Sequence, residues 1–370
     1  MSAQARGELP LWYSAGLVPV LNVACAFLVA GLVVLAIGAS PIDAVRILLR
    51  GALGSPYGIG YTLYYATTFI FTGLAVAIAF HAGHFNIGGE GQSLLGGLGI
   101  ALVVLNLAFL PSPLLILLTI AGAALLGAAW AFIPGWLQAY RGSHVVITTI
   151  MFNFLAFGLL GYLLVGPMKR PDSMSLETLP FVEGARLFRA DEILGWMGIA
   201  MPRTPLNLSF ALALLCALFT WVLIWRTRLG YEIRTVGANP TAAHYAGISS
   251  KRITVIVMLM GGAFAGMMAT NEILGVQQRL IADFTAGAGF VGIAVALMGR
   301  GHPVGIVLAS LLFGVLYQGG AELAFDMPLM TKDMIIVIQG LVILFAGALE
   351  NMFRDRIAGW IFRKPVEVAP

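Results

Sequence analysis

The stretch Phe80–Gln92 reads FHAGHFNIGGEGQ and interrupts an otherwise apolar part of the chain. It separates two uncharged runs, Thr62–Phe80 and Ser93–Leu110. Its glycines give backbone freedom and close approach instead of packing, and its polar side chains are of the kind that a membrane interior excludes. A polar, Gly-rich break between apolar runs favours a solute path. The alternative is an ordinary short loop with helix caps.

The composition predicts an integral membrane protein. Mean hydropathy is +0.93, 59% of the 370 residues are hydrophobic and 10% are charged, whereas soluble domains carry about 25% charged residues. Basic residues in a membrane protein chiefly set its orientation. The net charge of +4 therefore indicates no nucleic-acid partner.

The apolar runs predict an all-α protein with about ten transmembrane helices in one domain, residues 1–370. The run Phe284–Met298 is short, because its fifteen residues reach only about 22 Å against a hydrocarbon core of about 30 Å. It is either a half-helix or a span extended by its flanks. The other runs are Leu17–Ala39, Thr62–Phe80, Ser93–Leu110, Leu114–Ile133, Val145–Val165, Leu206–Trp225, Ile253–Asn271, Pro303–Ala321 and Met334–Leu349.

Lysine and arginine orient these spans. They gather in a loop at about 226–252 and in the C-terminal tail, which the positive-inside rule places in the cytoplasm. Ten spans then put both termini inside, and the segment at about 166–205 becomes the outer loop. Arg46 and Arg50 fall on the predicted outer side against this rule. The amphipathic segment Ile42–Leu53 is expected to lie along the membrane interface.

The cytoplasmic loop carries local signals for a short surface helix. Asn239 is suited to the N-cap, Pro240 to the first helical position and Gly247 to the C-terminal stop. Such a helix, over Thr241–Ala246, is too short to span a bilayer. It favours docking of a cytoplasmic partner, with a plain membrane-surface turn as the alternative. The residues expected in this coupling role are Asn239, Pro240, Ala242, Ala243, Tyr245 and Gly247.

A second Gly-rich break precedes the short run in the last third of the chain. Asp283–Phe290 reads DFTAGAGF, so both breaks place phenylalanine beside a glycine cluster at the start of a span. The predicted topology puts the first break on the inner side and the second on the outer side. Two such segments of opposite orientation are typical of inverted-repeat halves with broken helices around a central path. Gly-rich helix packing is the alternative.

Polar and aromatic side chains at the breaks are the candidates for a solute path, with structural roles as the alternative for each. Amides donate and accept hydrogen bonds, which suits sugar hydroxyls and base edges. No metal-binding or catalytic motif accompanies them, and the chain lacks a phosphate-binding loop for ATP. The path candidates are Phe85, Asn86, Glu90, Gln92, Asn153, Phe284 and Phe290.

Four stretches resemble a known family. They are HAGHFNIGGEGQ (81–92), VITTIMFNF (146–154), RTRLGYEIRTVGANPTAAHYAGI (226–248) and FTAGAGFVGIAVALMGRGHPVGI (284–306). Together they are similar to bacterial ABC-importer permeases of the ribose and branched-chain amino-acid family. The branch that they resemble is the nucleoside and simple-sugar one, which is served by basic-membrane-lipoprotein binding proteins. One departure is His144-Val145-Val146, where relatives often carry an acid.

The resemblance implies a permease subunit of the bacterial inner membrane. It implies pairing with a second permease, two ATPase subunits and an external substrate-binding lipoprotein, with ATP and magnesium bound by the ATPase and no cofactor in this chain. It also implies that the 226–248 loop couples to the ATPase. The expected function is import of a nucleoside or related sugar, without enzymatic activity of its own. The alternative is an ion-coupled secondary transporter, for which Glu90, Glu272 and Glu322 are the available buried acids.

Overall fold

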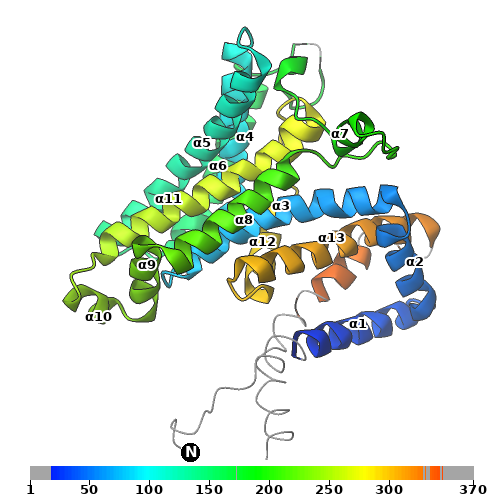
Figure 1. The fold of residues 1–370 in the computed structure, drawn as a ribbon, viewed down its shortest axis with the longest axis horizontal. Coiled ribbons are helices and arrows are strands. Elements are labelled where there is room, and N and C mark those ends of the chain that lie inside the picture. The colour runs from blue at the N-terminus through cyan, green and yellow to red at the C-terminus, as the bar shows by residue number, and fades with distance from the viewer. Residues whose placement is uncertain (1–17, 172, 328–329, 331–333, 342–343, 345–370) are drawn as a thin grey trace, which may run out of the picture. The chain divides into compact units, whose positions relative to one another are not determined.

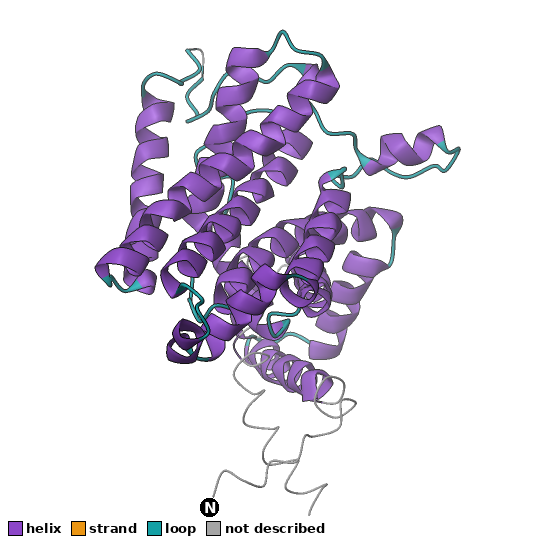
Figure 2. Cartoon of the chain, turned by 60° about the vertical axis from the view of Figure 1, so that its left-hand side comes forward, coloured by secondary structure: helices purple, strands orange, loops and turns teal. Residues whose placement is uncertain are grey.

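The computed structural model describes residues 18–171, 173–327, 330, 334–341 and 344. Over these ranges the regular structure is helical and contains no strand (Figures 1 and 2). The predicted all-α class is therefore confirmed for the part of the chain described. The chain divides into two compact units, Met1–Gly51 with Gly319–Pro370, and Ala52–Gln318.

The first unit holds α1 (Val18–Ala36) and most of α2 (Pro41–Leu53). Gly38 and Ser40 lie in the break, where the axes of the two helices turn by 119°. α2 is amphipathic as predicted, with Leu48 buried and Arg46 and Arg50 exposed. Its position at a membrane interface stays a prediction. Residues 334–341 are also helical.

The second unit contains most of the remaining helices (Figure 1). Its first complete helix is α3, whose N-cap is Ser55. Helix α13 continues past Gln318, where this unit ends. The elements are α3 (Pro56–Phe80), α4 (Gly89–Leu107), α5 (Ser112–Arg141), α6 (Val145–Val165), η2 (Glu183–Ala185), α7 (Ala190–Trp196), α8 (Ser209–Arg226), α9 (Arg228–Ala238), α10 (Pro240–Tyr245), α11 (Ser250–Ala269), the π-helical η3 (Thr270–Gln277), α12 (Ala288–Met298) and α13 (Pro303–Asp326).

Helix α3 is the centre of this unit, since every residue from Ala66 to Ala79 is buried. Helix α11 packs against α3, α4 and α5. Glycines bring α5 and α11 together: a Cβ added to Gly127 would lie 2.8 Å from Gly266 Cα, and one added to Gly262 would lie 2.5 Å from Ala131 Cβ. Small residues at helix contacts let backbones approach closely, which is how transmembrane helices gain packing energy.

The second unit has two ends. At one end, His81 closes α3 and its Nε2 lies 3.0 Å from Gly301 O, in the turn after α12. Helices α9 and α10 belong to this end, because Gly237 lies against the backbone of His81. At the other end, Thr178 N donates to Leu280 O at 3.0 Å, which fastens the 166–208 segment to residues after η3.

Seven helices of the described part are long and apolar enough to cross a membrane, or eight if the bent α1–α2 pair counts as one span. The protein is thus a multi-pass membrane protein. Helix α12 has 11 residues, about 16 Å, so the half-helix alternative for Phe284–Met298 is confirmed. The run Met334–Leu349 and both termini lie largely outside the described residues, and the count of ten spans stays a prediction.

Candidate functional site

The two Gly-rich breaks meet through the side chain of Glu90. Its Oε1 accepts from Thr285 Oγ1 at 2.5 Å and Gly287 N at 3.0 Å, and its Oε2 accepts from Gly289 N at 2.7 Å. Only 1% of Glu90 is exposed. Because Gly287 precedes α12 and Gly289 lies in its first turn, this carboxylate caps the N-terminus of α12. A negative charge there complements the exposed N–H groups and the helix dipole.

The contact shows where the two breaks meet, and their placement on opposite sides of the membrane stays a prediction. The first break leaves α3 at the His81 end and runs without helix from His84 to Ile87. The second returns from the end at Leu280 and reaches Glu90 before α12 begins. Each break therefore enters from a different end, and the two meet at Glu90. Non-helical backbone inside a membrane-spanning unit leaves N–H groups without helical partners, and the buried carboxylate supplies an acceptor for two of them. The inverted repeat itself stays a prediction.

The amides of the first break satisfy one another. Asn86 Nδ2 donates to Gln92 Oε1 and Gln92 Nε2 donates to Asn86 Oδ1, each at 3.1 Å. Asn153 on α6 reaches the same segment, where its Nδ2 donates to Ile87 O and its Oδ1 accepts from Gly91 N, both at 2.9 Å. All three amide side chains are buried. They hold the extended segment in shape, and a contact with solute stays a prediction for them.

The three predicted phenylalanines occupy different surroundings. Phe284 is buried against α4, where a Cβ added to Gly97 would lie 2.6 Å from its ring. Phe85 is partly exposed and its ring centroid lies 6.3 Å from that of Phe80. Phe290 on α12 is 46% exposed. The structure thus brings Phe284 into the junction of the two breaks and leaves Phe290 on a helix surface.

The predicted surface helix is present as α10. Asn239 Oδ1 accepts from Thr241 N at 2.9 Å and from Ala242 N at 3.0 Å, so it is the N-cap. Pro240 opens the helix, and Gly247 follows it with φ +75°. Ala243 is buried and holds α10 on the protein, whereas Tyr245 is 87% exposed. Ala242 and Gly247 are exposed as well, so every predicted coupling residue except Ala243 faces outward.

Two features of these regions were not predicted. The stretch before α10 is itself a helix, α9, capped by Thr227, whose Oγ1 accepts from Gly230 N at 3.1 Å. Thr227 followed by a helical pattern was a usable N-cap signal. Thr285 was not assigned a role either. Its partner Glu90 is 195 positions away, so no local signal could have indicated the pair.

His81 and His84 bind different partners. His81 contacts Gly301 O, and His84 Nε2 lies 2.7 Å from Thr254 Oγ1 at the start of α11. Burial lowers the pKa of His81, which favours the neutral ring. Over the described ranges, no group of three or more His, Cys, Asp or Glu residues is arranged to hold a metal ion.

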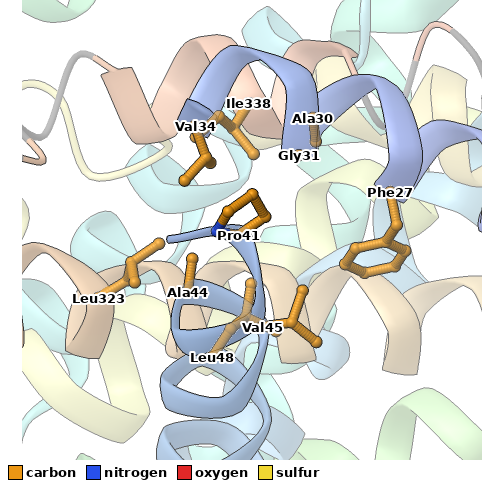
Figure 3. Close-up of a pocket in the computed structure, with 10 residues that line it drawn as sticks. All are labelled: Phe27, Ala30, Gly31, Val34, Pro41, Ala44, Val45, Leu48, Leu323 and Ile338. Atoms are coloured by element: carbon orange, nitrogen blue, oxygen red, sulfur yellow. The ribbon is translucent and has the colours of Figure 1, made fainter. Parts of the chain in front are cut away.

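A pocket in the first unit does not provide an alternative site for a polar solute. Figure 3 shows it between α1 and α2, with Phe27, Val34 and Pro41 among its walls. All of its lining side chains are apolar. Recognition of a polar small molecule needs a few placed polar groups in addition to apolar walls, so the polar junction around Glu90 is the stronger candidate.

Buried polar breaks inside a helical membrane unit, with a capped helix at one end, define a transport protein of the membrane. The comparisons give its family: residues 58–347 match the model of the branched-chain amino acid transport system permease component. The chain belongs to this family and is a permease subunit of an ABC transporter, not an enzyme. This agrees with the main prediction and not with the ion-coupled alternative.

Three similar proteins carry permease names. The glucose ABC transporter permease protein TsgB13 of Haloferax volcanii is 37% identical over 357 residues, 95% of this chain and 92% of that protein. The nucleoside permease protein NupB of Lactococcus lactis is 34% identical, covering 84% of this chain and 85% of its own length. The guanosine permease protein NupP of Bacillus subtilis is 34% identical, covering 90% and 93%. No solved structure matches the chain.

Proposed function

We propose that this chain forms one side of the solute path of an importer for a nucleoside or a related sugar. Its partners are a second permease, cytoplasmic ATPase subunits that bind ATP and magnesium, and an external substrate-binding lipoprotein. It lies in the inner membrane with α9 and α10 in the cytoplasm. The named relatives transport glucose, nucleosides or guanosine, which supports this class of solute.

The observation that carries the proposal is the junction at Glu90. Two non-helical segments meet at this junction, and α12 starts only where Gly287 N donates to the Glu90 carboxylate. Irregular backbone at membrane depth is tolerated only where it is buried in protein or lines a cavity. A relative movement of the two segments changes access without unfolding a full-length helix. This suits alternating access, in which one element rocks against another around a fixed site.

Coupling to ATP is assigned to the exposed face of α10 and its neighbour α9. Tyr245 is 87% exposed and Arg228 has 93% of its side chain exposed. Ala243, being buried, transmits a displacement of α10 to the rest of the unit instead of touching the ATPase. A short helix that is capped at Asn239 and anchored underneath moves as a rigid body, which is what coupling to a partner requires.

A second permease is supported by pairs among the relatives. Lactococcus lactis has both NupB, 34% identical, and NupC, 26% identical to this chain. Haloferax volcanii likewise has TsgB13 and TsgC13. Two similar but distinct permeases in one organism are expected if the path forms between two related chains.

The test is ATP-dependent uptake by the complete complex. The permease is expressed with its partner ATPase, second permease and lipoprotein and placed in liposomes, with labelled adenosine and labelled glucose as probes. Uptake of either that requires ATP supports the proposal. Uptake driven by an ion gradient without the ATPase would contradict it.

A matched pair of variants tests coupling. Tyr245→Ala removes an exposed side chain of α10, and Tyr162→Ala removes one of α6 that is 71% exposed. We expect the first to weaken capture of the ATPase and the second to leave it unchanged. Equal capture by both variants would remove α10 from the proposed docking surface.

A further inference from the structure

A second group of polar side chains lies within the spans, on faces of α3, η3 and α13. Tyr65 on α3, Glu272 on η3 and Tyr317 on α13 are each partly exposed. They differ in this from Asn86 and Glu90, which are buried and hydrogen-bonded within the protein. Polar groups that are costly at membrane depth yet remain reachable mark substrate pathways in transport proteins.

Glu272 has acceptor capacity to spare. It accepts hydrogen bonds from Tyr64 Oη and, at 3.0 Å, from Thr68 Oγ1. A carboxylate offers about four lone-pair positions, so two are left. No cation among the described residues forms an ion pair with Glu272. The remaining acceptor positions therefore suit donors that arrive from outside the protein, such as the hydroxyl groups of a solute.

The carboxylate is held in place by its neighbour in the π-helical turn. Asn271 is buried, and its Nδ2 donates to Tyr64 O at 3.1 Å and to Thr68 Oγ1 at 2.8 Å. Its Oδ1 accepts from Ser209 Oγ at 2.7 Å. Asn271 thus fastens η3 to α3 and α8, which fixes the direction of Glu272. π-helical segments inside α-helices occur frequently at functional sites.

Tyrosine rings connect Glu272 with α13. The Tyr65 and Tyr317 ring centroids are 5.7 Å apart, and Tyr317 lies 4.9 Å from Phe69. The Tyr64 hydroxyl donates to Glu272, and the ring centroids of Tyr64 and Tyr65 are 5.3 Å apart. A line of tyrosine rings, Tyr64, Tyr65 and Tyr317, therefore runs from the η3 carboxylate to α13. Aromatic faces of this kind stack on bases and on the C–H faces of sugar rings.

We propose that Glu272, Tyr65 and Tyr317 form the solute-recognition site of the path, and that they bind a neutral ring compound with adjacent hydroxyl groups. Glu272 accepts hydrogen bonds from two of the hydroxyls, and the solute ring packs against the outer side of the Tyr65–Tyr317 pair, whose own rings contact each other. Asn271 acts as a positioning residue. This assignment rests on the proposed function and moves the site from the predicted residues at Glu90 to the carboxylate of η3.

The test compares uptake kinetics of three variants in the reconstituted complex. Glu272→Gln removes the charge, keeps one oxygen as an acceptor for Tyr64 or Thr68, and places its NH2 group against the other hydroxyl, whose oxygen can accept. Tyr317→Phe removes one hydroxyl and keeps the ring contacts. Tyr162→Phe, on the exposed face of α6, is the matched control. The probes are labelled adenosine and glucose, with 2′,3′-dideoxyadenosine and 2-deoxyglucose as analogues that lack hydroxyls.

We expect KM for the transported probe to rise at least about tenfold in Glu272→Gln, with the maximal rate within about twofold. The preference for the hydroxylated probe over its deoxy analogue should collapse in that variant. A smaller rise is expected for Tyr317→Phe and none for Tyr162→Phe. A merely structural role would lower the amount of folded complex and leave this preference unchanged.

Three results would overturn the assignment. If the wild-type complex transports a probe with ATP but Glu272→Gln retains its KM and its hydroxyl preference, the site lies elsewhere and the proposed function stands. If Glu272→Gln instead loses capture of the second permease, the exposed face is a subunit interface. If the wild-type complex transports neither probe with ATP, the proposed function and this site fail together.

Discussion

Replacing Glu90 tests the junction of the two breaks most directly. In Glu90→Gln the amide oxygen can accept either from Thr285 and Gly287 or from Gly289. The NH2 group then faces the backbone N–H of the other side, Gly289 or Gly287, and cannot accept from it. One hydrogen bond to a charged group is lost, worth about 1.5–3 kcal/mol, and a buried N–H is left without an acceptor. Since Glu90 is 1% exposed, water cannot replace the bond. We expect a loss of about 2–4 kcal/mol in the free energy of unfolding.

Glu90→Ala should cost more. All three contacts with Thr285, Gly287 and Gly289 disappear, and a cavity replaces the side chain. A loss of about 4 kcal/mol or more follows, although the three bonds share one carboxylate and their contributions do not add fully. α12 would also lose the negative group at its N-terminus, which contributes to the same loss.

The assay is thermal unfolding of the detergent-purified protein, followed by size-exclusion fluorescence. Glu183→Gln is the control, because Glu183 is exposed in the 166–208 segment and should shift stability by no more than about 0.5 kcal/mol. We expect a Tm at least about 5 °C lower for Glu90→Gln than for this control. Uptake by the surviving folded protein should stay near that of the wild type.

Two outcomes separate the roles of Glu90. A Tm equal to that of the control would refute the cap, since a buried carboxylate with three donors cannot be replaced without cost. A normal Tm with lost uptake would instead place the side chain in contact with solute.

Three further predictions use other contacts. Gly266→Ala should destabilise by about 2 kcal/mol or more, because its Cβ meets the α5 backbone, whereas Gly158→Ala on α6 meets nothing and should be neutral or slightly stabilising in the same Tm assay. Asn239→Ala removes the α10 cap, worth about 1 kcal/mol, and should weaken ATPase capture while the overall Tm stays unchanged; a lower Tm would contradict it. The third prediction concerns Glu177 in the 166–208 segment. Desolvation raises the pKa of its carboxyl group, but hydrogen bonds from Ser173 and Arg279 lower the pKa by more, so the net shift is downward. Its stabilisation is present above a pKa of about 4.3 and is lost as pH falls through the lower folded value, so Tm should drop more on acidification in wild type than in Glu177→Gln.

Local signals in the sequence were sufficient for several elements. The run Val145–Val165 became α6 with the same bounds, because an uncharged apolar run between polar and glycine flanks leaves little choice in a membrane. Helix α10 followed from its own cap, proline and terminal glycine. Helix α3 starts at Pro56, before the predicted Thr62, because its first turns mix tyrosines and glycines and so hide the apolar signal.

The contact between the two breaks could not be predicted from such local signals. The lengths of the runs did not reveal that both breaks reach Glu90, since each break is compatible with several positions along the membrane normal. The place where the two breaks meet is set by the hydrogen bonds that Glu90 accepts from Gly287 N and Gly289 N. The likeness of the two glycine clusters was visible in the sequence, but their distance in space was not.

The sequence by itself therefore determined the class of protein, most of its helices and the two segments where helix is interrupted, because apolar length, glycine content and capping residues act within a few positions. Only the tertiary structure decided which polar side chains are hydrogen-bonded within the protein and which keep acceptor positions open. Asn86 and Glu90 are hydrogen-bonded to partners within the protein, whereas Glu272 keeps open acceptor positions. That difference depends on donors brought from distant helices, and hydrogen-bond satisfaction is a property of the packed fold, not of the run of residues.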